Sequence, residues 1–581
     1  MHDDRLLPIL RRSFGLDSFR GGQRRVIEHL LGGGDAIVIW PTGSGKSLCY
    51  QFPAVALDAP VLVLSPLIAL MQDQVEALRA KGIAATFVNS TVDRAERERR
   101  AADFSRGRWR LLYVTPERFR NDSFAAAIAP ARIGLLAIDE AHCISAWGHD
   151  FRPEYGRVGE IRERLGRPPT VALTATATPA VLGEIRRRLH LSDPLVDHAG
   201  LARPNLFLAA TIARDESEKW ERVDLLLRRV RGAGIVYGAL IRDLHRLEEW
   251  LHARWAREGA GEERLLVYHG DLSREERRAM HERFRAPDGR APARVLATRA
   301  FGMGIDKPDL RSVLHHQVPG SVEELWQEVG RAGRDGRPSY SELLYCEQDL
   351  PIQMQFVRAA NPDRRLFREV ERRIAEWTAR GETFDLESLR RAVAGRAADG
   401  RVETCVAWLE ALGAVEGDPA RGRMRQVRPL APEEEPEELG PDKEKRDLAR
   451  LGRVVEYVRT DRCRRRFLRD YFGLAPAPVE NCAACDVCVD REEWLAREFP
   501  APVAGGRSAR APSRKGAPAG PAAEGRAPRR GDFVRVDGRL LGRVVRVSGR
   551  GRDARVEVEI ASTLATRAFP VRRHRIEVLE R

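Results

Sequence analysis

The chain is poor in lysine and has no long apolar run. Only seven of its 99 basic residues are lysine, so its formal net charge of +14 rests on arginine. A charge of this size favours an anionic partner, although a composition rich in arginine and alanine is also typical of GC-rich genomes. Net charge by itself therefore leaves the kind of partner open.

The apolar runs all fall short of the ~20 residues that a helix needs to cross a bilayer, so we expect no membrane partner. The first five residues, Met-His-Asp-Asp-Arg, lack the basic and apolar regions of a secretory signal peptide. We therefore expect a cytoplasmic protein. In that compartment the eight cysteines would be reduced or bound to metal rather than paired in disulfides.

At 581 residues the chain is too long for one hydrophobic core, so several domains are expected. Up to about residue 350, short β-branched runs alternate with helical patterns, which indicates parallel sheets covered on both faces. The predicted strands form two series, 36–40, 61–65, 111–115, 135–139 and 171–174, then 234–237, 265–269, 295–298 and 313–317. We therefore expect two α/β domains, over residues 1–200 and 201–350, that join near 201–205.

Residues 361–430 show a different pattern. Three helical stretches, near 362–380, 385–394 and 402–412, precede two short strands on either side of Asp418-Pro419. Three helices and a hairpin describe a winged helix, whose second strand would carry Arg421, Arg423, Arg425 and Arg428. A small helical spacer has the same pattern, so both interpretations stay open.

Two linkers and a small β-domain are expected in the remaining sequence. Residues 431–447 are rich in proline and glutamate, which predicts a solvated acidic linker. Residues 496–530 are rich in Ala, Gly, Pro and Arg and are predicted to form a disordered basic linker. Strand patterns over 531–581 predict a small SH3-like or tudor-like β-barrel, a fold that binds proteins as often as nucleic acids.

A phosphate-binding loop is predicted where Pro-Thr-Gly-Ser-Gly-Lys-Ser follows a strand and precedes a helix. In such a loop the glycines let backbone N–H groups wrap phosphate, Lys46 reaches the β- and γ-phosphates, and Ser47 ligates magnesium. The residues predicted to contact ATP are Thr42, Gly43, Ser44, Gly45, Lys46 and Ser47. A chance glycine-rich loop is the competing interpretation, but the flanking strand and helix argue against it.

Two carboxylates and two arginines complete the predicted hydrolysis site. Asp139 is expected to hold magnesium through water, and Glu140 to act as general base on the attacking water. Phosphoryl transfer also needs positive charge at the γ-phosphate. Arg331 and Arg334 are predicted to lie on one face of a helix, and either is a candidate for an arginine finger that reaches across from the second domain.

An aromatic-rich segment follows the Asp-Glu-Ala-His sequence directly. It contains Trp147, His149, Phe151 and Arg152, and such side chains stack on bases and grip phosphate. The pattern predicts a nucleic-acid contact beside the hydrolysis site. A packed hydrophobic loop is the alternative, but it does not explain the polar residues between the aromatic ones.

Four cysteines have the spacing of a metal site. Cys482, Cys485 and Cys488 are separated by two residues each, and Cys463 lies upstream of them. Four thiolates close a tetrahedral structural zinc site, although an iron–sulfur cluster also uses four. We predict zinc within a helical module over 448–495. The scattered cysteines are predicted to be ordinary buried or loop thiols, namely Cys49, Cys143, Cys346 and Cys405.

Taken in order, these motifs over residues 14–350 resemble the helicase core of RecQ-family DNA helicases, within superfamily two. The Trp-Gly-His-Asp-Phe-Arg-Pro segment that begins at Trp147 is the most specific match. The segments Gln-Glu-Val-Gly-Arg-Ala-Gly-Arg-Asp-Gly, Thr-Ala-Thr-Ala and Ala-Thr-Arg-Ala-Phe-Gly-Met-Gly-Ile-Asp-Lys-Pro are also similar to family motifs. Cys463-Arg-Arg-Arg-Phe resembles the family's zinc module.

The resemblance implies two tandem RecA-like P-loop domains and assigns further residues. Arg20 and Gln23 would read adenine, and Gly304 and Asp306 would also contact the nucleotide. The aromatic-rich segment, with Trp147, His149, Phe151 and Arg152, would sense single-stranded DNA and license hydrolysis. Leu16 departs from the aromatic residue that commonly stacks on the base, and the winged-helix candidate precedes the zinc module instead of following it.

The function implied by the resemblance is an ATP-dependent 3′→5′ DNA helicase of recombination and repair, nucleoid-associated, which uses ATP, magnesium and zinc. It would act on single-stranded DNA and forked duplexes. The C-terminal barrel, which departs from the usual family order, is a candidate site for protein partners. The rearranged C-terminal half motivates one alternative, a DNA-stimulated translocase or remodeller that does not unwind. A second alternative is a non-motor winged-helix DNA-binding protein.

Overall fold

The computed structural model describes residues 5–89, 91–120, 122–145, 152–258, 265–285, 294–301, 307–394, 400–417, 424–436, 439–474, 481–500, 533–536, 540–548, 555–560, 566–570 and 576–580. The chain divides into two compact units, residues 1–501 and residues 502–581. Among the helices of these ranges, none is both long and apolar enough to span a membrane.

The first α/β domain is built on a seven-stranded parallel sheet with the order β3-β4-β2-β5-β6-β1-β7. Its strands are β1 (Ala36–Ile39), β2 (Val61–Leu64), β3 (Ala85–Val88), β4 (Leu111–Val114), β5 (Leu135–Ile138), β6 (Thr170–Thr174) and β7 (Leu195–His198). Its helices are α1 (Leu6–Phe14), α2 (Gln23–Leu31), α3 (Leu48–Ala56), α4 (Ile68–Ala80), α5 (Arg94–Ser105), α6 (Asp122–Ile128), α7 (Val158–Arg164) and α8 (Pro179–Arg188).

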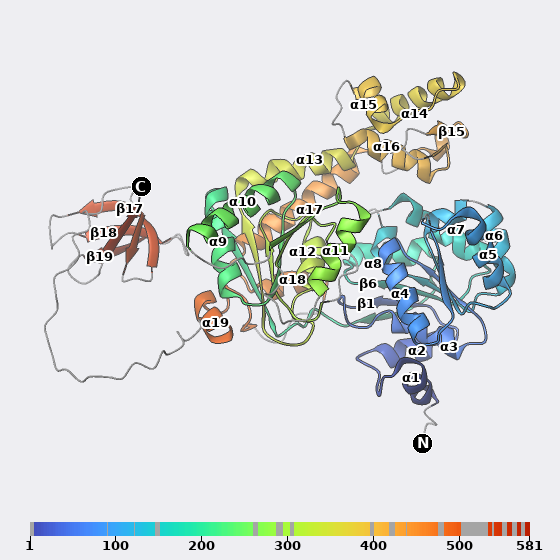
Figure 1. Ribbon diagram of the computed structural model, residues 1–581, viewed down its shortest axis with the longest axis horizontal. Coiled ribbons are helices and arrows are strands. Elements are labelled where there is room, and N and C mark those ends of the chain that lie inside the picture. The colour runs from blue at the N-terminus through green and yellow to red at the C-terminus, as the bar shows by residue number, and fades with distance from the viewer. Residues whose placement is uncertain are drawn as a thin grey trace. The chain divides into compact units, whose positions relative to one another are not determined.

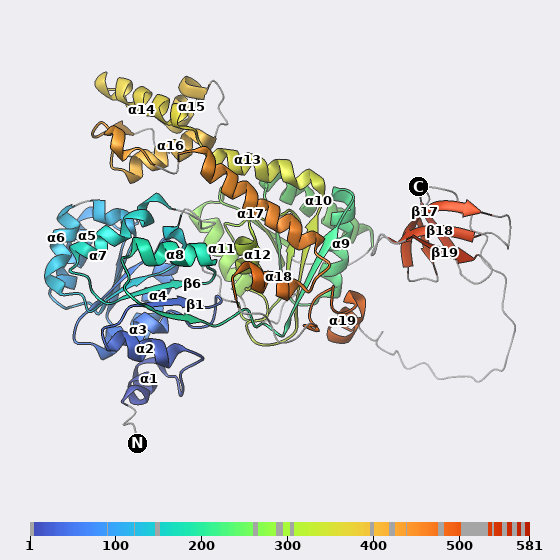
Figure 2. The same ribbon diagram turned by 180° about the vertical axis from the view of Figure 1, so that it is seen from behind.

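Alternating side chains of this sheet serve two separate cores. Val38 and Val63 point to one face, which is covered by α1 to α4. Ile39 and Leu64 point to the other, which is covered by α5 to α8. Figures 1 and 2 show helices on both sides of the strands. Continuous burial explains why β1, β2, β4 and β5 are uninterrupted apolar runs.

The second α/β domain contains a six-stranded parallel sheet with the order β10-β11-β9-β12-β13-β8. Its strands are β8 (Leu206–Ile212), β9 (Ala233–Tyr237), β10 (Leu265–Tyr268), β11 (Arg294–Ala297), β12 (Leu310–His315) and β13 (Ser339–Tyr345). Helices α9 (Glu216–Arg229) and α10 (Ile241–Arg257) cover one face. Helices α11 (Arg274–Arg285) and α12 (Val322–Val329) lie on the other.

The two sheets confirm the expected pair of tandem α/β domains. The first sheet ends at His198 and the second begins at Leu206, so the predicted join lies between them. All nine predicted strands overlap observed ones, whereas β3, β7, β8 and β13 were not predicted. Strand β13 was missed because it carries Ser339, Ser341 and Glu342, polar residues that are nevertheless buried.

After α13 (Leu350–Ala360), three helices and a short hairpin form a separate core. The elements are α14 (Arg364–Ala379), α15 (Leu386–Ala394), α16 (Gly400–Ala411) and the antiparallel strands β14 (Val415–Glu416) and β15 (Arg425–Gln426). Their cluster includes Phe367, Val370 and Leu409 and is distinct from the clusters on the two parallel sheets. Asp385 accepts a hydrogen bond from the Ser388 amide at 2.7 Å, which caps the start of α15. The predicted turn at Asp418-Pro419, with Arg421 and Arg423, lies outside the described residues.

Helices α17 (Pro441–Arg459), α18 (Arg464–Tyr471) and α19 (Arg491–Glu498) return to the second domain. Helix α17 lies beside α13, as both views show (Figures 1 and 2). Val454 and Phe467 of α17 and α18 join the core on one face of the second sheet. On the other face, Trp494 of α19 packs on Phe207 with their rings 4.6 Å apart. The cysteine-bearing segment is thus anchored on both faces of this sheet.

The second unit contains a five-stranded antiparallel sheet with the order β19-β18-β17-β16-β20. Its strands are β16 (Phe533–Val536), β17 (Leu540–Ser548), β18 (Arg555–Ile560), β19 (Thr566–Pro570) and β20 (Ile576–Glu580). All five lie within residues 531–581, where strand patterns were predicted. The basic linker predicted over 496–530 lies outside the described residues beyond position 500.

The prediction of a solvated acidic linker over 431–447 is wrong. Glu434 pairs with Arg428 at 2.7 Å, and Glu435 lies 2.9 Å from Arg368. Helix α17 already begins at Pro441, because proline in the first turn and acidic residues after it stabilise a helix N-terminus. Of the six glutamates in this stretch, Glu433, Glu434, Glu435 and Glu444 are described and Glu437 and Glu438 are not.

Candidate functional site

The predicted P-loop connects β1 to α3 and bends through two left-handed glycines. Gly43 and Gly45 have φ values of +84° and +83°, which strongly favour glycine. Lys46 Nζ donates to the carbonyl oxygens of Trp40 at 2.8 Å and Pro41 at 3.3 Å. The loop therefore directs an ammonium group and the first amides of a helix toward one point, an arrangement that binds phosphate.

Two carboxylates face this ammonium from the end of β5. Burial and the neighbouring Glu140 raise the pKa of Asp139 to about 7, while Lys46 opposes that shift. Burial lowers the pKa of Lys46, and both carboxylates oppose that shift in turn. Asp139 and the nearby Ser47 hydroxyl supply hard oxygen ligands of the kind that magnesium prefers. The residues present thus fit a magnesium–ATP site.

Glu140 has an unusual backbone. Its φ of +49° lies in the left-handed region, where a non-glycine residue costs on the order of 1–3 kcal/mol. His142 Nδ1 lies 3.3 Å from Glu140 Oε2 and 3.0 Å from Thr174 Oγ1. Thr174 in turn donates to the Thr176 carbonyl at 2.9 Å. His142 thereby connects the carboxylates to the Thr-Ala-Thr segment, a contact that the sequence analysis did not predict.

The two arginines differ in position, and neither lies on a helix face as predicted. Helix α12 ends at Val329, and the glycines that follow, Gly333 (φ +60°) and Gly336 (φ +81°), turn the chain. Arg331 is buried beside Tyr237 in the second domain. Arg334 instead reaches the first domain, because a Cβ built on Gly43 would lie 2.8 Å from its Cδ. Only Arg334 therefore meets the P-loop.

Residues before the P-loop also contact it. Gln23 is buried and donates from Nε2 to the Gly45 carbonyl at 3.0 Å, and its Oε1 accepts the Arg20 amide at 2.8 Å. The Arg20 side chain is exposed. Gln23 thus touches the loop predicted to hold the phosphates, whereas Gly304 and Asp306, the other residues expected near the nucleotide, lie outside the described residues.

Only the ends of the aromatic-rich segment are described. Trp147, His149 and Phe151 lie outside the described residues. On one side, Ser145 donates to the buried carboxylate of Glu184 on α8. On the other, Arg152 Nη1 donates to the Pro66 carbonyl at 3.3 Å. Both ends are held by elements that begin at the carboxyl edge of the first sheet, close to Asp139.

The four predicted metal ligands come together. The sulfur atoms of Cys463, Cys482, Cys485 and Cys488 all lie within 4.8 Å of one another. A tetrahedral zinc with Zn–S distances of ~2.3 Å needs sulfurs about 3.8 Å apart, so the cluster fits zinc. Hydrogen bonding from Cys482 lowers the pKa of Cys485 to about 5, and the same contact raises the pKa of Cys482, so the thiols interact directly. The other four cysteines are buried and lie elsewhere.

The cysteine loop pairs with the backbone of β8. Leu208 and Cys485 form a parallel bridge, with hydrogen bonds of 3.1 Å from Leu208 N to Ala484 O and from Asp486 N to Leu208 O. Asp486 also accepts the Ala210 amide at 2.9 Å and an Arg464 guanidinium N–H at 3.0 Å. The metal ligands are therefore continuous with the second sheet.

Removing zinc should unfold this module. We expect chelation, or Cys485→Ser, to release one zinc per chain and to lower the free energy of unfolding by roughly several kcal/mol, because the helices of the module belong to the core of the second domain. Metal analysis and thermal unfolding measure both effects. Cys405→Ala, which alters a thiol in the separate core of α14–α16, is the control and should retain zinc. Unchanged unfolding after complete zinc loss would contradict a structural role.

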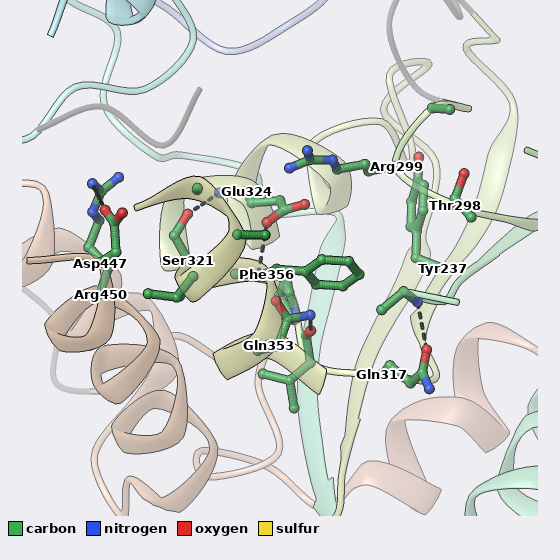
Figure 3. Close-up of a pocket in the computed structure, with 18 of the residues that line it drawn as sticks. Tyr237, Thr298, Arg299, Gln317, Ser321, Glu324, Gln353, Phe356, Asp447 and Arg450 are labelled. Carbon is green, nitrogen blue, oxygen red and sulfur yellow. Dashed lines mark hydrogen bonds and ion pairs between the residues drawn. The ribbon is translucent and has the colours of Figure 1, made fainter. Parts of the chain in front are cut away.

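A cavity of about 700 Å³ opens at the carboxyl ends of β9, β11 and β12 (Figure 3). Its floor includes Tyr237, Thr298 and Gln317, and its other walls come from α13, α16 and α17. In α/β sheets the carboxyl ends of the strands are where ligands bind. Sequence reasoning missed this cavity because its walls are more than 200 residues apart in the chain.

Three protein-family models match the chain in the order of its domains. DEAD/DEAH box helicase matches residues 20–185, Helicase conserved C-terminal domain matches 218–336, and RecQ zinc-binding matches 424–489. The last range contains all four clustered cysteines. The expected RecA-like pair and the zinc module are both supported by these matches.

Relatives include the Probable ATP-dependent DNA helicase RecS of Bacillus subtilis, 40% identical over 61% of this chain and 69% of that protein. The ATP-dependent DNA helicase RecQ of Synechocystis sp. is 33% identical over 83% of this chain and 97% of its own length. The RecQ of B. subtilis is 40% identical, but the match covers only 57% of it. Since two of these relatives are matched over more than two thirds of their length, the chain belongs to the RecQ family of ATP-dependent DNA helicases.

Proposed function

We propose that this chain is an ATP-dependent DNA helicase of recombination and repair, which couples ATP hydrolysis to 3′→5′ movement along one strand and to unwinding of the duplex. The observation that carries the proposal is the contact of Arg334 with Gly43. A hydrolysis site that needs groups from both α/β domains changes their separation whenever it opens or closes, which is the basic requirement of a motor.

The proposed chemistry assigns one role to each residue of the nucleotide site. Glu140 orients and deprotonates the attacking water, and Lys46 neutralises charge on the β- and γ-phosphates. Arg334 stabilises the charge that spreads over the transferred phosphoryl group. Arg331 is buried against Tyr237 and is proposed to hold that loop in place. Magnesium, held by Ser47 and Asp139, would supply further charge neutralisation.

DNA would be sensed beside this site. We propose that Trp147, His149, Phe151 and Arg152 contact a single strand, since both ends of their segment are attached near the hydrolytic carboxylates. His142 lies 3.3 Å from Glu140 and is hydrogen-bonded to Thr174, so we propose that these two residues relate the state of Glu140 to the segment before α8. Arg20 and Gln23 are proposed to read adenine, together with Gly304 and Asp306 at the nucleotide.

The remaining modules are proposed to bind duplex DNA and protein partners. The domain limits would be 1–200, 201–350, 361–430 for a winged-helix domain, 448–495 for the zinc module and 531–581 for a small β-barrel. The three helices and hairpin support a winged helix, and Arg425, exposed on its second strand beside Glu416, is the basic group proposed to contact DNA. The antiparallel sheet of the last unit supports a barrel that binds proteins. Cytoplasmic, nucleoid-associated localisation stays a prediction.

Strand displacement on duplexes with a 3′ or a 5′ single-stranded tail tests the proposed function. We expect displacement from the 3′-tailed substrate in the presence of ATP and magnesium, and ATP turnover that DNA stimulates strongly. Vigorous DNA-stimulated turnover without displacement from any tailed duplex would contradict unwinding and favour a translocase. Turnover that DNA does not change would contradict the DNA-sensing role of the aromatic-rich segment.

A further inference from the structure

The cavity at the strand ends of the second domain is walled by the helices that follow the sheet in sequence. Tyr237, Thr298 and Gln317 come from strand ends, whereas Phe356 lies on α13 and Trp408 on α16. Figure 3 shows the Phe356 ring pointing toward Tyr237. Helix α16 belongs to the separate core of α14–α16, so this group of helices contributes directly to a pocket of the second α/β domain.

The charged groups in the cavity are mostly neutralised. Asp447 pairs with Lys443 at 3.0 Å and with Arg450. Glu328 lies 2.7 Å from His315 Nε2, and Glu324 accepts the Gly320 amide at 2.8 Å. Three cations, with Arg299 the exposed one, balance three carboxylates. The charged side chains of the cavity therefore sum to about zero, and a ligand would be recognised chiefly by contacts other than attraction between phosphate and positive charge.

Phe356 supplies an exposed aromatic ring to the cavity. Phe356 is 46% exposed, although a phenylalanine of this size is usually covered. An exposed aromatic ring can stack on an unpaired base, because every base has a face that stacks on it. The exposed Arg299 guanidinium would meet the phosphate that joins such bases.

The wall that carries Phe356 is firmly attached. Asp349, the residue before α13, forms a buried ion pair with Lys219 at 2.7 Å. At the other end of α13, the Thr404 hydroxyl of α16 donates to the Ala359 carbonyl at 2.8 Å. The ring is thus held from both ends of its helix, which keeps it in place over the strand ends.

We propose that α13 and α16 close the DNA path of the second domain into a covered channel, in which Phe356 stacks on a base of the translocating single strand. The inference rests on the proposed function and goes beyond it. It gives α13 and the core of α14–α16 a role in retaining the tracked strand, in addition to any contact with the duplex.

The test compares Phe356→Ala, Phe356→Leu and Phe356→Trp with the unaltered full-length chain. Fluorescence anisotropy with a labelled single-stranded oligonucleotide should show about tenfold weaker binding for alanine and leucine. Tryptophan should restore the affinity, because it stacks whereas leucine offers only apolar area. Met354→Ala is the matched control, since Met354 is 37% exposed on the same helix and does not line the cavity. Its affinity should equal that of the unaltered chain.

A second probe removes the base instead of the ring. An oligonucleotide with a run of abasic sites should bind the unaltered chain more weakly than intact DNA, and this loss of affinity should be smaller for Phe356→Ala. Equal affinity of Phe356→Ala and the unaltered chain for intact DNA would overturn the inference, as would full retention of affinity by Phe356→Leu. The proposed function fails separately, namely if the unaltered chain shows no DNA-stimulated ATP turnover.

Discussion

Replacing Lys46 with alanine is expected to abolish ATP turnover and strand separation while DNA affinity stays close to that of the unaltered chain. The Lys46 ammonium interacts electrostatically with both Asp139 and Glu140. Without it, the β- and γ-phosphates lose their point charge at the P-loop, and we expect turnover to fall by about 10³-fold or more. Steady-state ATPase and strand-displacement assays measure the two losses.

Lys445→Ala is the matched control, because Lys445 is an exposed lysine at the start of α17 with only an exposed ion pair to Asp442. It should turn over ATP like the unaltered chain. DNA affinity, measured without nucleotide, separates a local effect from misfolding. Unwinding by Lys46→Ala at an unreduced rate would contradict the P-loop assignment, and with it the proposed function.

Replacing Arg334 with alanine should slow hydrolysis nearly as much, but for a different reason. Arg334 meets the P-loop from the other α/β domain, and an arginine finger is worth on the order of 10³-fold or more in kcat. Because its charge acts mainly on the transition state, kcat should fall far more than the affinity for ATP. Arg334→Lys should recover little, since a point charge cannot reproduce the planar guanidinium fork.

Arg337→Ala provides the control for Arg334, because Arg337 is exposed three residues further along the same loop. It should leave kcat unchanged. Arg331→Ala should instead destabilise the second domain, since Arg331 is buried beside Tyr237. Thermal unfolding therefore distinguishes the two arginines. If kcat of Arg334→Ala equals that of the unaltered chain, the proposed role of Arg334 as an arginine finger from the other domain is contradicted.

The sequence analysis correctly predicted the features that depend on residues close together in the chain. The P-loop needs glycines, a lysine and a hydroxyl within seven residues, and the four cysteines have a spacing that few other sites share. Apolar runs in β1, β2, β4 and β5 were recognised because both faces of a parallel sheet are covered. Each of these signals lies within a short stretch of chain.

Errors arose where distant residues decide the outcome. Strand β13 was missed because Glu342 is buried. Burial raises the pKa of this carboxyl group, but Arg222, Arg491 and Thr211 lower it to about 2. The acidic stretch was taken for a tether because its partners, Arg364 and Arg368, lie about 70 residues away. The position of Arg334 depends on glycines that end α12, and a three-residue spacing alone could not reveal that.

The pairing of the cysteine loop with β8 has a consequence for the fate of the protein when metal is scarce. Strand β8 is the last strand on one side of the second sheet, and Leu208 exchanges its backbone hydrogen bonds with the loop at Cys485. A strand whose backbone groups lose their partner becomes a template for strands of other molecules. We therefore expect zinc to protect the chain from self-association, so that zinc starvation shortens its lifetime by aggregation.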